Sequence, residues 1–554
     1  MDYSQHFNVR ETPQSEKIPG SKQVANSAGG FAFAVDDWVR LDRFLILGNE
    51  GGSYYATEKT LTKENAEAVL KCINADGIRA VARIVEISDS GRAPKNDPAI
   101  FALAMAAGLG DATTKAAALD ALPKVCRIGT HLFHFAQAVQ GFRGWGRGLR
   151  SAVGKWYLNQ EAEKLAVQVA KYQQRDGWSH RDLLRLSHPK SLDAGINSIL
   201  RWAVGKAPAD KSVEGKFSIA ELPKVILGLE KATASKEAKP REAAKIISEY
   251  ELPRECVPTE WLKHTEVWEA LLPDMPMTAM VRNLGNMSKV GLLKPLSDAS
   301  KAVCGKLADK DRIRKSRIHP VQILMALKTY SSGHGLRGSG AWIPVPQVVD
   351  ALDGAYYSAF ANVEPTGKRW YLGLDISGSM WGGAVAGIPD FPPAVASGAM
   401  AMVTVQAEKQ FYAAGFTCTQ SGRYGGQWDS GNTVMTPIAL TKKDRLDSTL
   451  KKMEALKERM GGTDCALPML DALEKNLTVD VFVIYTDSET WAGAIHPVQA
   501  LRKYRDKTGI PAKLIVCGMV SNGFSIANPD DGGMLDVVGM DASVPQVIGN
   551  FARN

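Results

Sequence analysis

Hydrophobic residues recur at helical spacing through most of the first two-thirds of the chain. Between residues 62 and 73, Val69 and Ile73 fall on one face of a helix, and the polar run 74–77 ends it. The same alternation of helix and polar break recurs in residues 98–109, 113–126, 182–186, 265–272, 278–284 and 321–330. Almost no strand-like alternation interrupts these helices. They therefore predict stacked helix pairs, an α-solenoid of the HEAT type, from about residue 39 to residue 357.

The pattern changes at residues 364–369. Beyond this point, short apolar runs of strand length occur at residues 370–375, 411–416, 479–485 and 512–517. Helical segments lie between them, up to 409 and at 442–460, 464–476 and 497–507. This alternation predicts a doubly wound parallel α/β domain of the Rossmann-like kind, with ligand sites at the carboxyl ends of its strands. We expect an N-terminal arm (1–20), a helical-repeat module (21–366) and the α/β domain (367–554).

The net charge of +8 is distributed unevenly between these parts. Residues 371–554 carry 16 Lys and Arg against 19 Asp and Glu, whereas residues 1–370 carry 51 against 40. Because a surplus of positive charge attracts polyanions by releasing their counterions, the helical module favours a partner rich in phosphate.

The remaining composition is that of an ordinary globular protein, with 45% hydrophobic and 23% charged residues. The longest nearly apolar stretch, 394–407, is too short to cross a bilayer, and the N-terminus lacks a signal pattern. The seven cysteines form no CxxC and lie far apart, so neither disulfides nor a zinc site is indicated. We expect a cytoplasmic protein without a membrane partner.

Oxygen-bearing side chains follow the predicted strands of the α/β domain. Asp375, Ser377 and Ser379 form a DxSxS arrangement in one tight turn directly after the first strand. Thr463 and Asp487 stand where further strands end. A small hard cation requires about six oxygen ligands, several of which are waters. Hydroxyls and two carboxylates can provide the remaining oxygens. These five side chains therefore predict a site for one divalent cation, Mg²⁺ in the first place and Mn²⁺ as the alternative.

The arrangement resembles the metal-ion-dependent adhesion site of von Willebrand factor A (vWA) domains. Many vWA domains have glycine after the last aspartate, whereas Ser488 stands there in this chain, which leaves the backbone geometry open. A second interpretation is that the site takes no external ligand and only fixes loops.

Two basic clusters lie in the helical module. In residues 171–190, the spacing of Lys171 and Arg175 places both on one helical face, and His188 follows at the end of the next helix. In residues 143–150, arginines alternate with a tryptophan and glycines, a composition suited to single-stranded RNA. The arginines of this second cluster are Arg143, Arg147 and Arg150. The alternative is that both clusters are solvated helix faces and that Trp145 and Trp178 belong to the core.

Several motifs, in one order along the chain, closely resemble the TROVE module of the Ro ribonucleoprotein family. They occupy residues 26–30, 40–44, 51–55, 126–133, 171–190, 317–320 and 333–338. The motifs at 364–369, 461–465, 486–489 and 511–518 resemble the vWA domain of the same family. The resemblance extends from about residue 20 to the C-terminus and is thinnest between residues 205 and 240.

The resemblance implies a monomeric HEAT-repeat ring with a central hole. Its outer surface would bind small noncoding Y or Y-like RNA, and its hole would admit the single-stranded 3′ ends of misfolded RNA, in noncoding RNA quality control. Lys171, Arg175 and His188 fall on family positions associated with RNA contact, whereas Arg337, like the arginines of residues 143–150, is proposed only from its basic character and glycine-rich setting. In bacterial relatives a Y-like RNA tethers the protein to a 3′-to-5′ exoribonuclease, which makes that enzyme an expected partner.

Two other classes of function compete with RNA binding. One is a cation-dependent protein-binding scaffold of the adhesion type, in which the helices only support the vWA domain. The other is a metal-dependent nuclease using Asp375 and Asp487. Phosphoryl-transfer sites usually have carboxylate-rich clusters, and no spare general base stands near the motif. We therefore expect an RNA-binding protein and not an enzyme.

Overall fold

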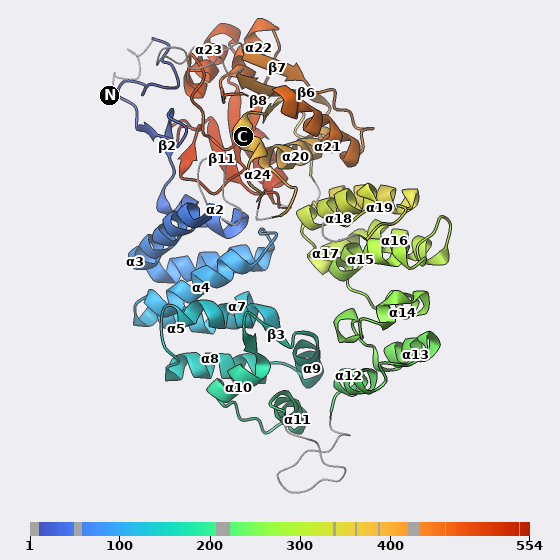
Figure 1. Cartoon of the computed structure of the whole chain (residues 1–554). Coiled ribbons are helices and arrows are strands. Elements are labelled where there is room, and N and C mark those ends of the chain that lie inside the picture. The colour runs from blue at the N-terminus through green and yellow to red at the C-terminus, as the bar shows by residue number, and fades with distance from the viewer. Residues whose placement is uncertain are drawn as a thin grey trace.

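The computed structural model describes residues 10–48, 58–205, 222–335, 340–360, 363–385, 388–418, 433–459, 461–541 and 543–553. Figure 1 shows two columns of helices, with an α/β domain lying across one end of both. In the described part of the chain, no helix is both long and apolar enough to cross a membrane.

The helices follow one another along the columns in sequence order (Figure 1). The first column contains α2 (Asp37–Leu47), α3 (Glu58–Ser90), α4 (Asp97–Leu109), α5 (Ala112–Asp120), α6 (Leu122–Val125), α7 (Gly129–Gln140), α8 (Arg147–Leu158), α9 (Ala162–Lys171), α10 (His180–Ser187) and α11 (Ala194–Ala203). The second contains α12 (Lys224–Ala234), α13 (Pro240–Tyr250), α14 (Thr265–Leu271), α15 (Met277–Lys289), α16 (Asp298–Ala308), α17 (Lys310–Ser316), α18 (Pro320–Ser332) and α19 (Pro346–Ser358).

Each predicted helical segment coincides with these helices, except that 113–126 is divided between α5 and α6 at Ala121. Neighbouring helices pack in pairs, such as α3 on α4 and α13 on α14. The predicted stop in residues 74–77 is present: Asp76 leaves helical geometry (φ −158°, ψ 88°), and its side chain accepts from the Arg79 N–H over 2.9 Å, so α3 consists of two helices that meet at a kink. Large side chains such as Trp261, Trp268 and Tyr157 are fully buried between the helices. The α-solenoid prediction is confirmed.

The two columns meet at both ends. At the far end from the α/β domain, α9 packs on α12. At the near end, the last residues of α3 and the loop after it contact the residues around the start of α18. We call these two segments, residues 89–94 and 317–322, the ring seam. There Arg317 Nη1 lies 3.1 Å from Asp89 Oδ1, and Gln322 Nε2 donates to Pro94 O over 3.2 Å. The helices therefore form a closed ring.

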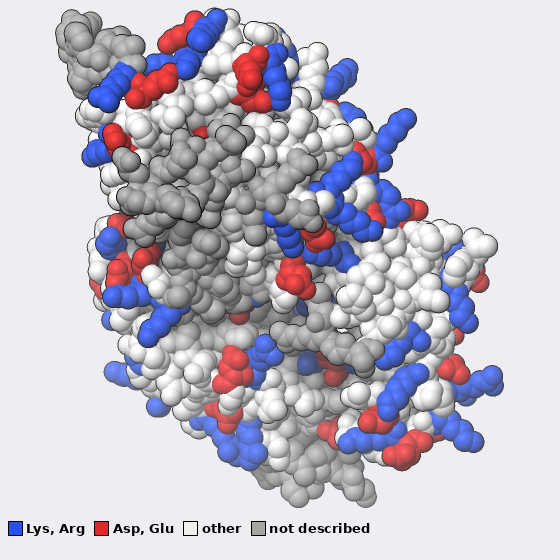
Figure 2. Space-filling view, turned by 45° about the horizontal axis from the view of Figure 1, so that its top comes forward, with Lys and Arg blue, Asp and Glu red and all other residues white. Residues whose placement is uncertain are grey.

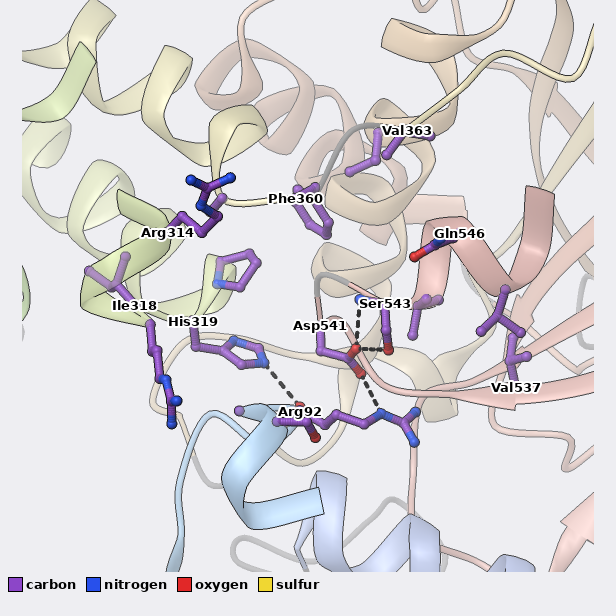
Figure 3. A pocket seen from close by; sticks show the side chains of 18 of the residues that line it. Arg92, Arg314, Ile318, His319, Phe360, Val363, Val537, Asp541, Ser543 and Gln546 are labelled. Atoms are coloured by element: carbon purple, nitrogen blue, oxygen red, sulfur yellow. Dashed lines mark hydrogen bonds and ion pairs between the residues drawn. The ribbon is translucent and has the colours of Figure 1, made fainter. Parts of the chain in front are cut away.

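The ring seam borders a pocket of about 1360 Å³ that the α/β domain completes (Figure 3). His319 and Arg92 come from the ring, and the Arg92 guanidinium contacts Asp541 of the α/β domain at 3.2 Å. The buried His319 is neutral for a structural reason. Its Nδ1 accepts from Val321 N–H (3.1 Å), so its Nε2 carries the proton and donates to Arg92 O (3.1 Å).

Acid is expected to weaken the ring seam. Burial lowers the pKa of His319 from 6.5 to about 4, although Asp541 opposes the shift. Because the unfolded chain binds the proton more readily, this contribution is present above pH 6.5 and is lost as the pH falls toward 4. We expect the free energy of unfolding to fall by about 2 kcal/mol more in the wild type than in His319→Asn between pH 7 and pH 5. Urea titrations at both pH values measure this, and parallel pH profiles would contradict it.

The α/β domain is built around one six-stranded sheet. Its elements are β5 (Arg369–Asp375), α20 (Pro393–Ala407), β6 (Gln410–Cys418), β7 (Thr433–Pro437), α21 (Leu446–Ala455), α22 (Leu467–Glu474), β8 (Val481–Thr486), α23 (Pro497–Thr508), β9 (Lys513–Gly518), β11 (Met534–Val538) and α24 (Val544–Arg553). The strand order is β11-β9-β8-β5-β6-β7, and only β7 is antiparallel to its neighbour. This confirms the predicted doubly wound fold, although β7, β11 and α24 were not predicted.

The strand order reverses at β5. From this strand the chain passes to β6 on one side and later to β8 on the other, so the carboxyl ends of β5 and β8 lie together at the topological switch point. Ligands of open α/β sheets bind at such points because the connections diverge there and leave a crevice. The DxSxS turn follows β5, and Asp487 follows β8.

The start of the chain packs on the α/β domain. Residues 10–34, here called the N-terminal strap, include β1 (Gln23–Ala25) and β2 (Phe31–Ala34), and β2 pairs with β10 (Phe524–Ser525). Gln14 is fully buried, and a Cβ at Gly30 would collide with Thr490 O. Residues 10–20 of the expected arm therefore lie against the C-terminal domain. So do residues 21–34, which the sequence assigned to the helical module.

Candidate metal centre and nucleic-acid surface

The five predicted cation ligands come together at the carboxyl edge of the sheet. Asp375 ends β5, Ser377 and Ser379 lie in the following turn and the 3₁₀ helix η4 (Gly378–Trp381), and Asp487 follows β8. Thr463 precedes α22. All five side chains are buried.

Hydrogen bonds join the hydroxyls to one another and orient the first carboxylate. Thr463 Oγ1 donates to Ser377 Oγ (2.8 Å), which lies 3.2 Å from Ser379 Oγ. Asp375 accepts from the Ser377 N–H (2.9 Å) and, through its other oxygen, from the Thr486 hydroxyl (2.7 Å). Since the protein already holds these oxygens, little ordering remains for a cation to impose.

The electrostatics of the cluster favour a cation. Burial and the neighbouring Asp487 raise the pKa of Asp375 to about 7, and burial also raises the pKa of Asp487. Within the described residues, neither carboxylate forms an ion pair with a basic side chain. Two buried carboxylates that repel each other are costly unless a positive charge compensates them. Carboxylate and hydroxyl oxygens together fit a hard divalent cation such as Mg²⁺.

Ser488 adopts the backbone conformation that favours glycine. Its φ is +61°, in the left-handed region, so the glycine of many vWA domains and this serine serve the same turn. The Ser488 hydroxyl is buried and has no hydrogen-bond partner within the described residues. The departure from the vWA pattern therefore leaves the turn intact and adds one polar atom beside the site.

The predicted helical pairing of Lys171 and Arg175 is wrong. Tyr172 leaves helical geometry (φ −114°, ψ 71°), so α9 ends at Lys171. Arg175 lies instead in β3 (Gln174–Arg175), which forms a two-stranded hairpin with β4 (Trp178–Ser179). The Arg175 side chain is 63% exposed, whereas that of Lys171 is 17% exposed and lies 3.5 Å from Glu255.

The hairpin is anchored to the ring by two polar contacts. His134 Nδ1 lies 2.5 Å from Asp176 Oδ2, and Trp178 Nε1 donates to Gln137 over 3.0 Å. His188 is exposed at the end of α10, where its φ of +47° turns the chain out of the helix. Arg175 and His188 therefore stand on rigid supports at the surface.

The structure brings the two basic clusters together. The rings of Trp145 and Trp178 lie 5.6 Å apart, which places the start of α8 beside the hairpin. Both tryptophans are partly buried and pack against the core. Arg147 and Arg150 are exposed in the first turns of α8.

The two remaining candidate arginines are Arg143 and Arg337. Arg143 is half-buried and donates to Ala107 O over 2.8 Å, at the end of α4, so it has a structural contact. Arg337 lies outside the described residues. Over the face shown in Figure 2, basic and acidic side chains are intermixed, so the sign of the surface charge alone singles out no binding region there.

Several residues around the cation cluster were not predicted. Thr486 orients Asp375, and the Asn522 side chain contacts the loop that carries Asp487. Asp464 and Gln14 form a buried hydrogen bond of 2.7 Å behind Thr463, and burial raises the pKa of Asp464 to about 6. Asp464 and Thr486 stand inside motifs that the sequence singled out, at 461–465 and 486–489, whereas Gln14 and Asn522 do not.

Comparison with known proteins finds two family models in the chain. The model of the TROVE domain matches residues 24–332, and the model of the Ro60 vWA domain matches residues 369–552. The chain is 40% identical to the RNA-binding protein RO60 of Deinococcus radiodurans, with 99% of this chain and 98% of the relative covered. It is 36% identical to the RNA-binding protein RO60 of Caenorhabditis elegans, with 97% and 91% covered.

A solved structure extends the likeness to the fold. The crystal structure of the Deinococcus radiodurans RO (RSR) protein matches with a TM-score of 0.67 at 40% identity, over 94% of this chain and 99% of that one. The two curated relatives carry the name of a binding protein and not of an enzyme. The ring of helices, the switch-point cluster and these matches together lead to one conclusion: the chain belongs to the Ro60 family, with a TROVE domain followed by a Ro60 vWA domain.

Proposed function

We propose that this chain is a cytoplasmic RNA-binding protein of noncoding RNA quality control. It binds small Y or Y-like RNA on the outer surface of a monomeric ring and the single-stranded 3′ ends of misfolded RNA through the ring. The names of the relatives support RNA as the partner. In this proposal the RNA tethers a 3′-to-5′ exoribonuclease, and the chain itself has no catalytic role.

The observation that carries the proposal is the unbalanced positive charge at the start of α8. Arg147 and Arg150 stand at the end of the helix where the backbone dipole is itself positive, and the first turn holds no acidic residue. The N-cap, Gly146, provides no side chain to accept from the first N–H groups. An external phosphate would satisfy these N–H groups and both guanidinium groups.

The hairpin extends this surface. Arg175 supplies a third exposed guanidinium beside Trp178, and His188 supplies a ring that can bond a phosphate or stack on a base. Lys171 lies at the edge of the cluster, where Glu255 shares its charge. We assign Lys171, Arg175, His188, Arg147 and Arg150 to RNA binding.

The vWA domain serves a different partner in this proposal. Asp375, Ser377, Ser379, Thr463 and Asp487 would hold one Mg²⁺ or Mn²⁺. The cation supplies an open coordination position for a carboxylate of a partner protein. The surrounding hydroxyls and the two buried aspartates would hold the ion, and as ligands both aspartates are committed to it.

Binding of a structured small RNA tests the surface. We expect Lys171→Ala combined with Arg175→Ala to weaken binding by about 10–100-fold, because two charge-assisted contacts are lost. The slope of log affinity against log salt should fall by about 1–2. Fluorescence anisotropy at several salt concentrations measures both quantities, and Asp375→Ala should bind like the wild type.

Lys301→Ala combined with Arg314→Ala is the matched control. It removes the same total charge, here from two exposed positions on α16 and α17, each of which is paired with an aspartate three residues away. Equal weakening by both double variants would overturn the surface assignment. Cleavage of naked RNA that requires Mg²⁺ and disappears in Asp375→Ala would favour the nuclease instead.

A further inference from the structure

The loop that carries Asp487 is held from two sides by parts of the chain outside the sheet. Residues 487–490, here called the ion-site loop, lie between the N-terminal strap and the side chain of Asn522. Within this loop, the Glu489 N–H donates to Asp487 Oδ1 over 3.0 Å and so orients the carboxylate. The position of Asp487 therefore depends on what fixes Glu489 and the loop backbone.

Asn522 contacts the ion-site loop with its donor group. Its Nδ2 donates to the carbonyl oxygen of Asp487 at 2.7 Å and to Glu489 Oε1 at 3.2 Å. Its Oδ1 accepts from Arg43 Nη1 at 3.1 Å. Because a guanidinium can only donate, Arg43 must face the oxygen of this amide. The nitrogen is thereby directed at the loop.

Arg43 brings the helical ring into this arrangement. It belongs to α2, the first described helix of the ring, and is 1% exposed. Its Nη1 also donates to the carbonyl oxygens of Asn522 (3.1 Å) and Phe524 (2.7 Å). Its Nη2 lies 2.8 and 2.7 Å from the two oxygens of Asp536. The guanidinium thus holds Asn522 by backbone and side chain at once.

The N-terminal strap holds the other side of the loop. The N–H groups of Ser27 and Ala28 donate to Glu489 Oε2 at 2.8 and 3.2 Å. Asn26 Nδ2 donates to Thr490 O at 2.8 Å. With Asn522 on its other oxygen, the buried Glu489 carboxylate cannot rotate without breaking these bonds.

We propose that Asn522, oriented by Arg43, is a positioning residue of the cation site. It holds the backbone of Asp487, and through Glu489 the Asp487 carboxylate, in the geometry that a divalent cation needs. The affinity of the vWA domain for the cation then depends on helix α2 of the ring. By linkage, a bound cation stabilises the attachment of α2 to the vWA domain by the same free energy. The inference rests on the proposed cation site and assigns a role to residues that do not themselves ligate.

Titration of the full chain with Mn²⁺ tests the proposal. Electron paramagnetic resonance of Mn²⁺ gives both the affinity and a spectrum that reports the ligand geometry. Asn522→Leu should bind Mn²⁺ about 10–100-fold more weakly, the usual effect of losing a hydrogen bond behind a metal ligand, and should change the spectrum of the bound ion. Arg43→Lys should bind Mn²⁺ several-fold more weakly than the wild type, because one ammonium cannot hold Asn522 and Asp536 together. The loss should be smaller than in Asn522→Leu, because the Asn522 amide itself remains.

Ser521→Ala is the matched control at the same junction. The Ser521 hydroxyl donates to Gly48 O (2.6 Å) and accepts from Asn65 Nδ2 (3.3 Å), both in the ring region. Within the described residues it forms no hydrogen bond with the ion-site loop. It should keep the wild-type affinity and spectrum. An equal loss in Ser521→Ala would show a general effect of the junction and overturn the role of Asn522.

The outcomes separate this inference from the proposed cation site. Wild-type affinity in both Asn522→Leu and Arg43→Lys would overturn the inference and leave the site intact. No Mn²⁺ binding by the wild type, as by Asp375→Ala, would overturn the site itself. If Asn522→Leu does not fold, the affinity of the milder Arg43→Lys decides.

Discussion

Replacing Arg43 with methionine is expected to lower the free energy of unfolding by about 3–5 kcal/mol, because removing one partner of a buried ion pair leaves the other uncompensated. Methionine keeps an apolar stem of similar length but offers no donor. The Asp536 carboxylate and the carbonyl groups of Asn522 and Phe524 would each lose a charged hydrogen bond. Urea unfolding at pH 7, followed by circular dichroism, measures the change.

The same substitution at an exposed arginine provides the control. Arg314 pairs with Asp311 at 2.8 Å, but both side chains are more than two-thirds exposed, at 78% and 71%. Surface pairs of this kind contribute little, so Arg314→Met should change stability by no more than about 1 kcal/mol. Similar losses in the two variants would contradict the structural role assigned to Arg43.

The second large effect is a reversal of stability between Asp375→Asn and the wild type. Without divalent cation, the variant should be at least as stable, because it removes the repulsion between two buried carboxylates. At a Mg²⁺ concentration 100 times the dissociation constant, the wild type should gain about 2.7 kcal/mol. The variant lacks a ligand and should gain nothing. Thermal unfolding in chelator and in excess Mg²⁺ measures both differences.

Asp471→Asn separates the cation site from buried carboxylates in general. Asp471 is also buried, but it pairs with Lys475 at 2.6 Å and accepts from the Tyr371 hydroxyl at 2.7 Å. Its substitution should leave the Mg²⁺-dependent gain unchanged. A wild type whose unfolding temperature does not respond to Mg²⁺ would refute the cation site.

The central strands could be predicted from sequence because they are buried on both faces. The strands β5, β8 and β9 therefore read as continuous apolar runs. Edge strands carry no such signal. β7 reads Thr-Val-Met-Thr-Pro, and β11 contains Asp536, whose partner Arg43 lies 493 residues earlier. Asp536 is acceptable in this strand because Arg43 pairs with it. No local sequence pattern can reveal a partner at that distance along the chain.

The cation ligands were predictable for a similar reason, since strand and turn motifs are local. Asn522 stands 35 residues from the loop it contacts, and nothing in its neighbourhood along the chain indicates that contact. The error at Arg175 was avoidable. Asp176 and Gly177, both with positive φ, form the two-residue Asp-Gly turn that is the strongest short signal for a hairpin. This turn predicts a hairpin at Arg175, and the helical spacing of Lys171 and Arg175 is coincidental.

The N-terminal strap has a consequence for the biosynthesis of this protein. A ribosome makes the strap first, yet Gln14 bonds to Asp464 and Ile495, 450 and 481 residues later, and β2 pairs with β10. The nascent strap can pair β1 with β2, but it must wait for its partners in the vWA domain until residues 464–525 are translated. Closing so long a loop costs entropy before any contact compensates it, so strap docking should be a late folding step. A fragment that begins at residue 369 lacks the strap, so its strand β10 would have no β2 to pair with.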